Sequence, residues 1–319
     1  MAKTTPRFES FTGTLSSSLW HTVLRELDIT VRLLKSNATG FLFIFMGGLL
    51  SRVFKAPLPL AETIPLLTET VILELLCSYI FDIANQTSSP DEDYINKPDR
   101  PIPAGLMTVE KAKARWVLAW VLGPVALYSL FGVWPMMHLL HWEVLITVCY
   151  VWPKWFGWLM RSYFASSSYC ILGRLLNSVL ARHVEAWNIS FAIDCIIFFW
   201  LMGTMHIQEF HDLEGDRKSD RKTLPMLLSD RGIKVLREGT SLFVLAFGTC
   251  LCSIGYTVMD KDIKILPLCI LQQLLSIVLA YRIYASDGPA MDKKTYRVYY
   301  YGAVLAILLC LCLIEKQLV

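Results

Sequence analysis

The sequence predicts an all-α integral membrane protein, and three observations support this fold class. The chain of 319 residues is 55% hydrophobic and 18% charged, which is too apolar for a water-soluble globule of this length. Its hydrophobic residues gather in long stretches, each close to the ~20 residues that a helix needs to cross about 30 Å of hydrocarbon. Two short segments rich in charge, 82–105 and 208–225, follow such stretches.

The hydrophobic stretches predict about nine transmembrane helices, joined in a single domain over residues 36–319. We place them at 36–54, 60–84, 112–134, 138–152, 168–187, 188–207, 236–258, 263–284 and 297–315. Residues 1–35 are polar and lack the short basic start and apolar core of a secretory signal. We therefore expect them to form a cytosolic N-terminal segment.

Lysine and arginine are concentrated in the connections that follow the second, fourth, sixth and eighth stretches. Because positive residues favour the cytosolic side, these connections and both charged segments are expected to face the cytosol. The net charge is only +3, and it forms no continuous basic face, so the expected partner is the lipid bilayer rather than nucleic acid. No obligate protein partner is evident, and the endoplasmic reticulum is the expected membrane.

The segment 208–225 reads QEFHDLEGDRKSDRKTLP and carries a row of carboxylates. On a helix, Glu209, Asp212 and Asp216 would share one face, because they are spaced at i, i+3 and i+7. An unpaired row of this kind repels itself, whereas a hard divalent cation accepts several oxygen ligands. The segment therefore indicates a Mg²⁺ site, with a merely solvated charged loop as the alternative.

The segment 82–105 reads DIANQTSSPDEDYINKPDRPIPAG. Ser89, Pro90 and Glu92 fit a capping box, which predicts that a new helix begins at Pro90. Asp93 is then the first expected metal ligand, and the further candidates are Asn85, Glu92 and Asn96. The closing prolines should end this helix and fix Arg100 at the mouth of the site.

The two charged segments resemble each other, since each is an acidic and then basic run that ends in proline. Each follows the second of four consecutive hydrophobic stretches, which predicts two four-helix halves plus one last helix, with both segments facing one cavity. Carboxylate clusters edged by cations suit a diphosphate, whose oxygens Mg²⁺ can bridge to the carboxylates.

The motifs N-x7-D-x2-N-K-P-x-R-P-I-P and E-x2-D-x-E-G-D-x4-R-K-T-L-P resemble those of the UbiA superfamily of intramembrane prenyltransferases. The resemblance covers nearly the whole chain. It implies a U-shaped helical bundle that opens to lipid and binds a Mg²⁺-bound prenyl diphosphate under a cytosolic cap. The catalytic and metal-binding residues it implies are Asp93, Asp212 and Asp216, with Asn85, Asn96 and Glu209 as further metal ligands. Glu92, which is not part of the family motif, remains a candidate ligand from its place beside Asp93. The diphosphate contacts it implies are Arg32, Asn37, Arg100 and Lys154, and Lys97, Arg217 and Lys222 of the two charged segments are further candidates.

The first motif departs from the usual family pattern, because Gln86 and Ser89 stand where aspartates are common. This departure is similar to a fungal branch that contains UbiA-type sesquiterpene cyclases of the bergamotene-forming kind. It implies ionisation of farnesyl diphosphate and cyclisation of the cation to a sesquiterpene. Fungal enzymes that prenylate aromatic acceptors can carry similar motifs, so an acceptor prenyltransferase is the alternative.

The two hypotheses require different cavities. A cyclase needs aromatic faces that stabilise a carbocation, each worth about 0.5–2 kcal/mol. The candidates are Tyr79, Phe81, Tyr150, Trp155, Trp158, Tyr163, Tyr169, Phe198, Phe199 and Trp200, although most aromatic residues of a membrane protein only pack or anchor. A transferase needs a polar group that orients its acceptor, and the candidates are Arg174, Asn177, Lys154 and His206. A transporter is a third, weaker hypothesis, because transporter sites tend to lie near the bilayer midplane.

Overall fold

The computed structural model describes residues 9–88, 90–151, 157–211, 213, 223–258 and 265–318, and every regular element within them is helical. The α-helices are α1 (Glu9–Leu34), α2 (Ala38–Leu42), α3 (Gly48–Lys55), α4 (Leu60–Ser88), α5 (Pro90–Asn96), α6 (Val109–Phe131), α7 (Val133–Ile146), α8 (Trp158–Leu180), α9 (Phe191–Thr204), α11 (Asp230–Val258), α12 (Ile265–Tyr284), α13 (Pro289–Lys294) and α14 (Tyr301–Leu318). Three π-helical segments, η1 (Phe43–Gly47), η2 (Thr147–Val151) and η7 (Thr295–Tyr300), interrupt these helices, and short 3₁₀ turns form η3 (Glu185–Trp187), η4 (Met205–Glu209) and η5 (Pro225–Leu227).

Among the described residues, seven helical stretches are long and apolar enough to cross a membrane. They are Ala38–Lys55, Leu60–Ser88, Val109–Phe131, Glu185–Glu209, Asp230–Val258, Ile265–Tyr284 and Pro289–Leu318, and they overlap seven of the predicted spans. The predicted span 138–152 corresponds to α7 and η2, and the predicted span 168–187 corresponds to α8. Both are helical but are less apolar than the seven. The all-helical membrane character is thus confirmed, while the count of nine and the two four-helix halves stay predictions.

Helix α8 differs most from its predicted span of 168–187, because it begins at Trp158 and ends at Leu180. Its first turns contain Arg161 and several serines that hydropathy assigns to a loop. Two of these serines, Ser162 and Ser166, are buried within the bundle, and the Ser166 hydroxyl donates to the Ser162 carbonyl at 2.8 Å. The start of this helix was missed because its inward-facing polar side chains make the segment less hydrophobic than a typical span.

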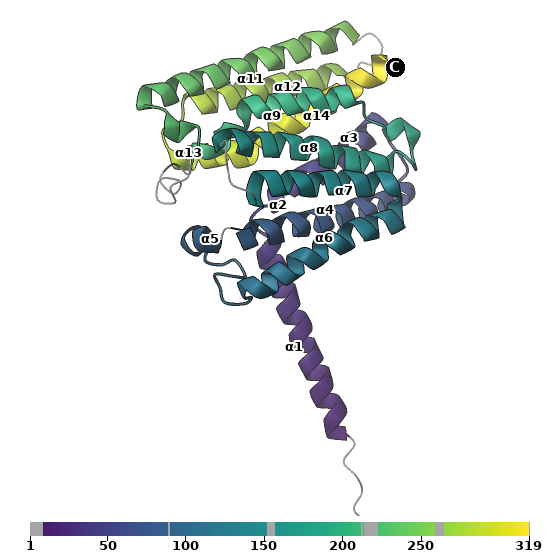
Figure 1. Ribbon diagram of the computed structural model, residues 1–319. Helices are drawn as coiled ribbons and strands as arrows, with labels where there is room; N and C mark the ends of the chain where they lie inside the picture. Colours follow the sequence, from purple (N-terminus) through teal and green to yellow (C-terminus); the bar gives the residue numbers. More distant parts are fainter. Residues whose placement is uncertain are drawn as a thin grey trace, which may run out of the picture.

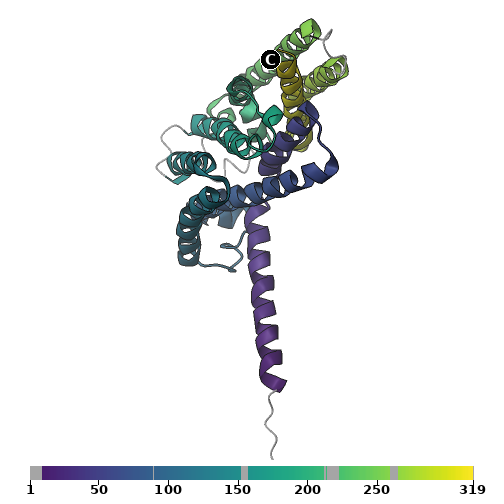
Figure 2. The ribbon, with the colours of Figure 1, turned by 90° about the vertical axis from the view of Figure 1, so that its right-hand side faces the viewer.

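Helix α1 projects from the bundle, as both ribbon views show (Figure 1, Figure 2). Near its C-terminal end, Ile29 and Leu33 are buried, and Leu33 packs with Ile83 of α4 and with Ile102 of the loop between α5 and α6. Arg115 of α6 also contacts Glu26 at 2.7 Å. These contacts fix the residues at the end of α1 beside the segment 82–105.

The remaining helices pack side by side in the order α6, α7, α8, α9, α14, α12 and α11, and α4 lies against both α6 and α7. The continuous stretch of α2, η1 and α3 runs through the middle, where η1 contacts α4, α8 and α14. One hydrophobic core lies among α4, α7 and α8, and the other lies among α9, α11, α12 and α14. The site described below lies where η1 joins these two cores.

Candidate active site

A cavity of about 1070 Å³ opens where η1 meets the two cores. Residues from the end of α1, from α2, η1, α4, α5, η2, α8, η4 and η7 line it. Each of the three described π-helical segments contributes side chains, among them Phe43 of η1, Tyr150 of η2 and Tyr296 of η7. Such segments widen the helical turn and occur frequently at functional sites, and here they direct large aromatic side chains into the cavity.

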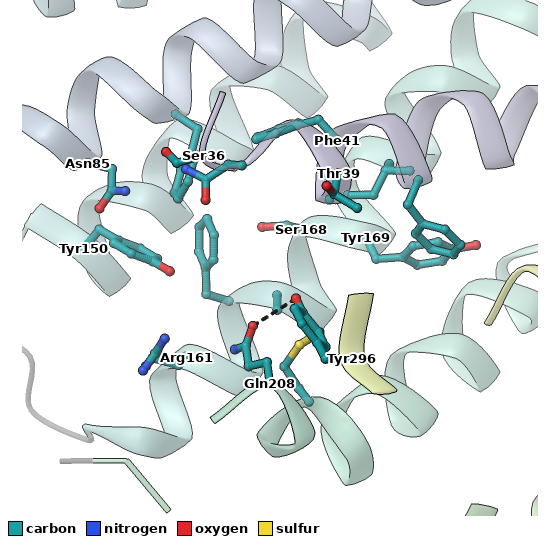
Figure 3. A pocket seen from close by; sticks show the side chains of 18 of the residues that line it. Ser36, Thr39, Phe41, Asn85, Tyr150, Arg161, Ser168, Tyr169, Gln208 and Tyr296 are labelled. Carbon is teal, nitrogen blue, oxygen red and sulfur yellow. Dashed lines mark hydrogen bonds between the residues drawn. The ribbon is translucent and has the colours of Figure 1, made fainter. Parts of the chain in front are cut away.

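The cavity changes from charged to aromatic along its helices. On α8, Arg161, Phe164, Ser168 and Leu172 line it at helical spacing, which spans about 16 Å at 1.5 Å per residue. On α4, the amide of Asn85 near the helix end gives way to Phe81 one turn deeper. Figure 3 shows Asn85, Tyr150 and Arg161 toward one side and Phe41 and Tyr169 toward the other. Polar groups thus lie where helices end, and aromatic groups lie within the spans.

Asp93 and Arg100 form a buried ion pair at the charged end. Helix α5 begins at Pro90, as predicted, and presents Asp93 to the loop that follows. The Nη1 atom of Arg100 lies 2.7 Å from both carboxylate oxygens of Asp93, and its Nη2 atom donates to Ser36 Oγ at 2.7 Å. The pair therefore ties the first charged segment to the connection between α1 and α2. Ser89, the proposed cap, lies outside the described residues.

Three further cations belong to the same cavity as this ion pair. Arg32, Lys35 and Lys97 all line the cavity. Arg32 donates to Asp28 at 2.9 Å, and Lys35 contacts Asp99 at 3.3 Å. Burial lowers the pKa of the Lys97 ammonium from its ordinary value, and the nearby Arg100 guanidinium acts in the same direction. An anion bound here would raise the pKa of Lys97 again, because an opposite charge favours the charged form of lysine.

Asn37 and Asn85 face the same end. The side-chain amide of Asn37 donates to Asp82, whose carboxylate is fully buried. Asn85 lies one turn further along α4 and lines the cavity. The structure therefore brings together Arg32, Asn37, Asn85, Asp93, Lys97 and Arg100 from the predicted site. The side chains of Glu92 and Asn96 lie outside the described part of the chain.

Glu209 brings the second charged segment to this cavity. It lies at the end of η4 and is buried, and its Oε2 atom accepts a hydrogen bond from the Leu224 amide at 3.2 Å. The Nη1 atom of Arg161 lies 3.6 Å from its Oε1 atom. Carboxylates from both predicted segments, Asp93 and Glu209, thus line one cavity. The predicted residues Lys154, Asp212, Asp216, Arg217 and Lys222 lie outside the described residues.

The donor set of the cavity fits a Mg²⁺ ion. Two carboxylates, Asp93 and Glu209, and the amide of Asn85 supply oxygen atoms, which Mg²⁺ prefers. Within the ranges that the structure describes, no three histidine, cysteine or acidic side chains gather closely enough to hold a metal by themselves. The described protein ligands are therefore few, which is usual for Mg²⁺ sites that are completed by substrate phosphates and water.

Sequence reasoning missed several residues of the cavity. Arg161 falls between the predicted spans 138–152 and 168–187, whereas the structure has it in the first turn of α8. Its helical spacing to Ser168 and Leu172 is the signal that could have identified it. Gln208 and Tyr296 also line the cavity, and the Tyr296 hydroxyl donates to Gln208 Oε1 at 3.1 Å (Figure 3). Tyr301 follows on α14, where the sequence pattern indicates only a membrane span.

The aromatic lining differs from the predicted one. Phe81, Tyr150 and Tyr169 line the cavity as expected, while Trp155 lies outside the described residues. The prediction was wrong for Tyr79, Trp158, Tyr163, Phe198, Phe199 and Trp200, which do not line it. Phe199 is 69% exposed on α9, whereas Trp200 is buried against Tyr300 with ring centroids 5.1 Å apart. The aromatic residues found instead are Phe41, Phe43, Trp142, Phe164, Tyr296, Tyr300 and Tyr301.

The residues suggested for orienting an acceptor serve other contacts. Arg174 pairs with Asp194 and donates to the Ile189 carbonyl at 2.7 Å. Asn177 Oδ1 accepts from Arg52 at 3.1 Å, which joins α8 to α3. His206 Nε2 lies 2.8 Å from Thr240 Oγ1. None of Arg174, Asn177 and His206 lines the cavity, because each is held in a polar contact between neighbouring helices. Lys154 lies outside the described residues.

Comparisons with known proteins agree with this geometry. The chain is 29% identical over 247 residues to the diterpene cyclase eriG of Hericium erinaceus, covering 74% of this chain and 72% of that protein. It is 27% identical over 292 residues to the somaliensene A/B synthase of Streptomyces somaliensis, covering 88% and 91%. It is also 28% identical over 224 residues to the polyprenyl transferase eriF of Hericium erinaceus, covering 70% and 73%.

A solved structure shares the fold. A UbiA homolog from Archaeoglobus fulgidus bound to GPP and Mg²⁺ superposes with a TM-score of 0.62 at 15% identity, covering 91% of this chain and 100% of that chain. The model of the UbiA prenyltransferase family matches residues 41–311, which include every described helix from η1 to η7 and most of α14. The chain therefore belongs to the UbiA prenyltransferase family.

Proposed function

We propose that the protein is a Mg²⁺-dependent membrane terpene cyclase that ionises farnesyl diphosphate and cyclises the resulting cation to a sesquiterpene. The observation that carries this proposal is the cavity itself, which joins a charged end to an aromatic interior. The charged end suits a diphosphate, and the interior suits a prenyl chain. The relatives named as a diterpene cyclase and as a somaliensene A/B synthase support cyclisation.

At the charged end, the chain's own residues would bind and orient the leaving group. Lys97, Arg100 and Arg161 present cations to the cavity, and guanidinium groups offer paired donors that match phosphate oxygens. Asp93 and Glu209 would hold Mg²⁺ together with Asp212 and Asp216. Bound Mg²⁺ would neutralise charge that develops on the departing diphosphate.

In the interior, aromatic rings would fold the prenyl chain and exclude water. Phe81 stacks on Phe164 with ring centroids 5.2 Å apart, and it forms a T-shaped pair with Tyr150, also with centroids 5.2 Å apart. Phe41 lies 5.9 Å from Phe81 and 5.8 Å from Trp142. A continuous set of ring faces of this kind attracts a migrating carbocation, with each contact worth about 0.5–2 kcal/mol.

One incubation tests this function. Purified protein with farnesyl diphosphate, Mg²⁺ and no acceptor should release diphosphate and form a volatile hydrocarbon, measured by gas chromatography and mass spectrometry. Parallel incubations with the C10 and C20 diphosphates test the proposed chain length. Hydrocarbon from the C20 substrate alone would contradict farnesyl specificity, and no hydrocarbon from any of the three would contradict cyclisation.

The similarity to the polyprenyl transferase eriF supports an alternative, in which the cation passes to an aromatic acceptor. The same incubation with an added phenolic acceptor tests it. A prenylated acceptor, together with no hydrocarbon in its absence, would favour the transferase. For either activity, we propose that the protein resides in the endoplasmic reticulum with its site facing the cytosol, as the distribution of positive residues indicates.

A further inference from the structure

A short chain of hydrogen bonds runs along the cavity wall, outside the group of residues proposed above to bind Mg²⁺ and diphosphate. The Tyr296 hydroxyl donates to Gln208 Oε1 at 3.1 Å, and it also lies 3.0 Å from the Tyr301 hydroxyl. All three residues line the cavity. Figure 3 shows the side chains of Gln208 and Tyr296 reaching toward each other in the cavity.

Local structure explains why the two tyrosines meet. They are five residues apart, and η7 is a π-helical segment that includes Tyr296 and ends at Tyr300, directly before Tyr301. In a π-helix, residues i and i+5 are joined by the backbone hydrogen bond, so that their side chains lie closer than in an α-helix. Their ring centroids are 5.4 Å apart. The π-helical segment therefore builds this pair of hydroxyl groups.

The hydrogen bonds have one direction. An amide oxygen only accepts, so Tyr296 must spend its single proton on Gln208 Oε1. Tyr301 must then donate to Tyr296. Because the Tyr301 hydroxyl donates its own proton to Tyr296, the lone pairs of the Tyr301 oxygen remain able to accept a proton. This oxygen lies close to Gly40 of α2, since a Cβ atom built on Gly40 would be 3.8 Å from it. Tyr301 therefore presents the acceptor end of the chain to the cavity.

The opposite end of the chain is next to the charged end of the cavity in the sequence. Gln208 directly precedes Glu209, whose carboxylate lies near Arg161 at the charged end. Tyr301, in turn, lies against Phe43, with ring centroids 5.3 Å apart, within the aromatic interior. The chain thus links the part of the cavity that would hold the carbocation to the part that would hold the released diphosphate.

We propose that Tyr301, Tyr296 and Gln208 carry away the proton whose loss ends the cyclisation. This inference rests on the proposed cyclase function. The breaking C–H bond leaves its electron pair to form the new C=C bond, and its proton binds to the Tyr301 oxygen. The Tyr301 proton passes to Tyr296 and the Tyr296 proton passes to Gln208 Oε1, while an Nε2–H proton of the same amide passes to the released diphosphate anion. Proton exchange with water then returns the imidic acid so formed at Gln208 to the amide. Tyr301 is the catalytic residue, and Tyr296 and Gln208 act through it.

The test compares product patterns with diphosphate release. In Tyr301→Phe and Tyr296→Phe, the ratio of the main hydrocarbon to its isomers and alcohols should fall by about tenfold, as a barrier difference of about 1.4 kcal/mol would give. Diphosphate release should stay within about threefold of the unmodified protein, because ionisation precedes the proton transfer. Tyr299→Phe is the matched control, because Tyr299 also belongs to η7. Its ring face packs against Arg282, with the guanidinium carbon 4.3 Å from the ring centre, and this contact does not need the hydroxyl group.

Three outcomes would overturn the proposal. An unchanged hydrocarbon pattern in both variants would remove the hydroxyl groups from the last step. Loss of diphosphate release in Tyr301→Phe would assign its hydroxyl to ionisation instead. An equal change of products in Tyr299→Phe would make the effect nonspecific. Each of these outcomes leaves the cyclase function intact, whereas the absence of hydrocarbon from the unmodified protein would overturn both proposals.

Discussion

At the scale of single residues, the ion pair between Asp93 and Arg100 links stability to function. Both side chains are almost fully buried. Asp93 is proposed to hold Mg²⁺ and Arg100 to bind diphosphate. In the protein without ligands, the negative charge of Asp93 and the positive charge of Arg100 neutralise each other. The bound Mg²⁺ and diphosphate would then take over as their partners. Removing either side chain should affect both folding and substrate binding.

The expected effects can be separated by a double-mutant cycle. Asp93→Ala or Arg100→Ala should each lower the free energy of unfolding by about 3–5 kcal/mol, because one buried charge remains without its partner. The double variant should lose less than the sum. Diphosphate release should fall by more than about 100-fold in Asp93→Ala. Loss of a residue that only supports a metal ligand usually lowers activity by about 10–100-fold, so a larger loss indicates that Asp93 binds the metal itself. Thermal unfolding in detergent and a diphosphate assay measure these effects.

Asp91→Asn provides the matched control, because Asp91 lies on the same short helix and is exposed. It should leave stability and diphosphate release nearly unchanged. Additive losses in the double variant would show that the ion pair contributes nothing to stability. Full diphosphate release by Asp93→Ala would contradict the role of Asp93 in binding the metal.

The sequence predicted much of the charged end and little of the aromatic interior. Asp93, Arg100 and Glu209 were found because charged side chains beside long apolar stretches are rare and short-range motifs place them. Phe41, Trp142 and Tyr301 were not, because an aromatic residue that faces a cavity looks the same in sequence as one that packs in the bilayer. Their direction depends on tertiary packing and on π-helical segments, which leave no sequence period.

At the scale of elements, an ion pair beside the second charged segment joins α11 to α13, with Asp292 buried and Arg237 partly buried. Arg237 of α11 contacts both carboxylate oxygens of Asp292 of α13, at 2.8 and 2.7 Å. Its guanidinium also lies 4.0 Å from the centre of the Phe210 ring. Because Phe210 directly follows Glu209, this arrangement holds the start of the second charged segment against the helices.

Asp292→Asn should therefore lower the free energy of unfolding by about 3–5 kcal/mol, since Arg237 would keep its charge while losing its partner. Thermal unfolding in detergent measures the effect. Asp287→Asn is the control, because Asp287 is exposed on the preceding connection and its change should stay within about 0.5 kcal/mol. Equal melting temperatures for the two variants would show that the ion pair does not fasten these helices.

Helix boundaries show a similar division between what the sequence could and could not predict. The restart at Pro90 was predicted because capping and proline geometry act within a few residues. The start of α8 at Trp158 was missed because its buried serines and Arg161 face the interior of the bundle. A hydropathy pattern identifies a transmembrane helix by its apolar residues. The part of a helix whose polar side chains line a cavity is therefore left out of the predicted span.

At the scale of the whole molecule, the cavity lies between two hydrophobic cores, and its carboxylates come from both charged segments. Asp93 and Arg100 precede α6, whereas Glu209 and Arg161 belong to η4 and α8. A Mg²⁺-bound diphosphate that contacts both sets would hold them together. Ligand binding should consequently stabilise the folded protein as a unit, without any need for turnover.

This expectation can be tested with a farnesyl thiodiphosphate, which is slow to ionise. At about 100 times its dissociation constant, and with Mg²⁺ present, the analogue should raise the free energy of unfolding by about 2.7 kcal/mol. Mg²⁺ alone, or farnesol with Mg²⁺, should give a much smaller increase, because neither supplies the bridging phosphates. Arg161→Gln should weaken the effect by removing a cation from one set. An equal increase with farnesol would show that the hydrophobic interior alone binds the ligand and would contradict the bridging role of the diphosphate.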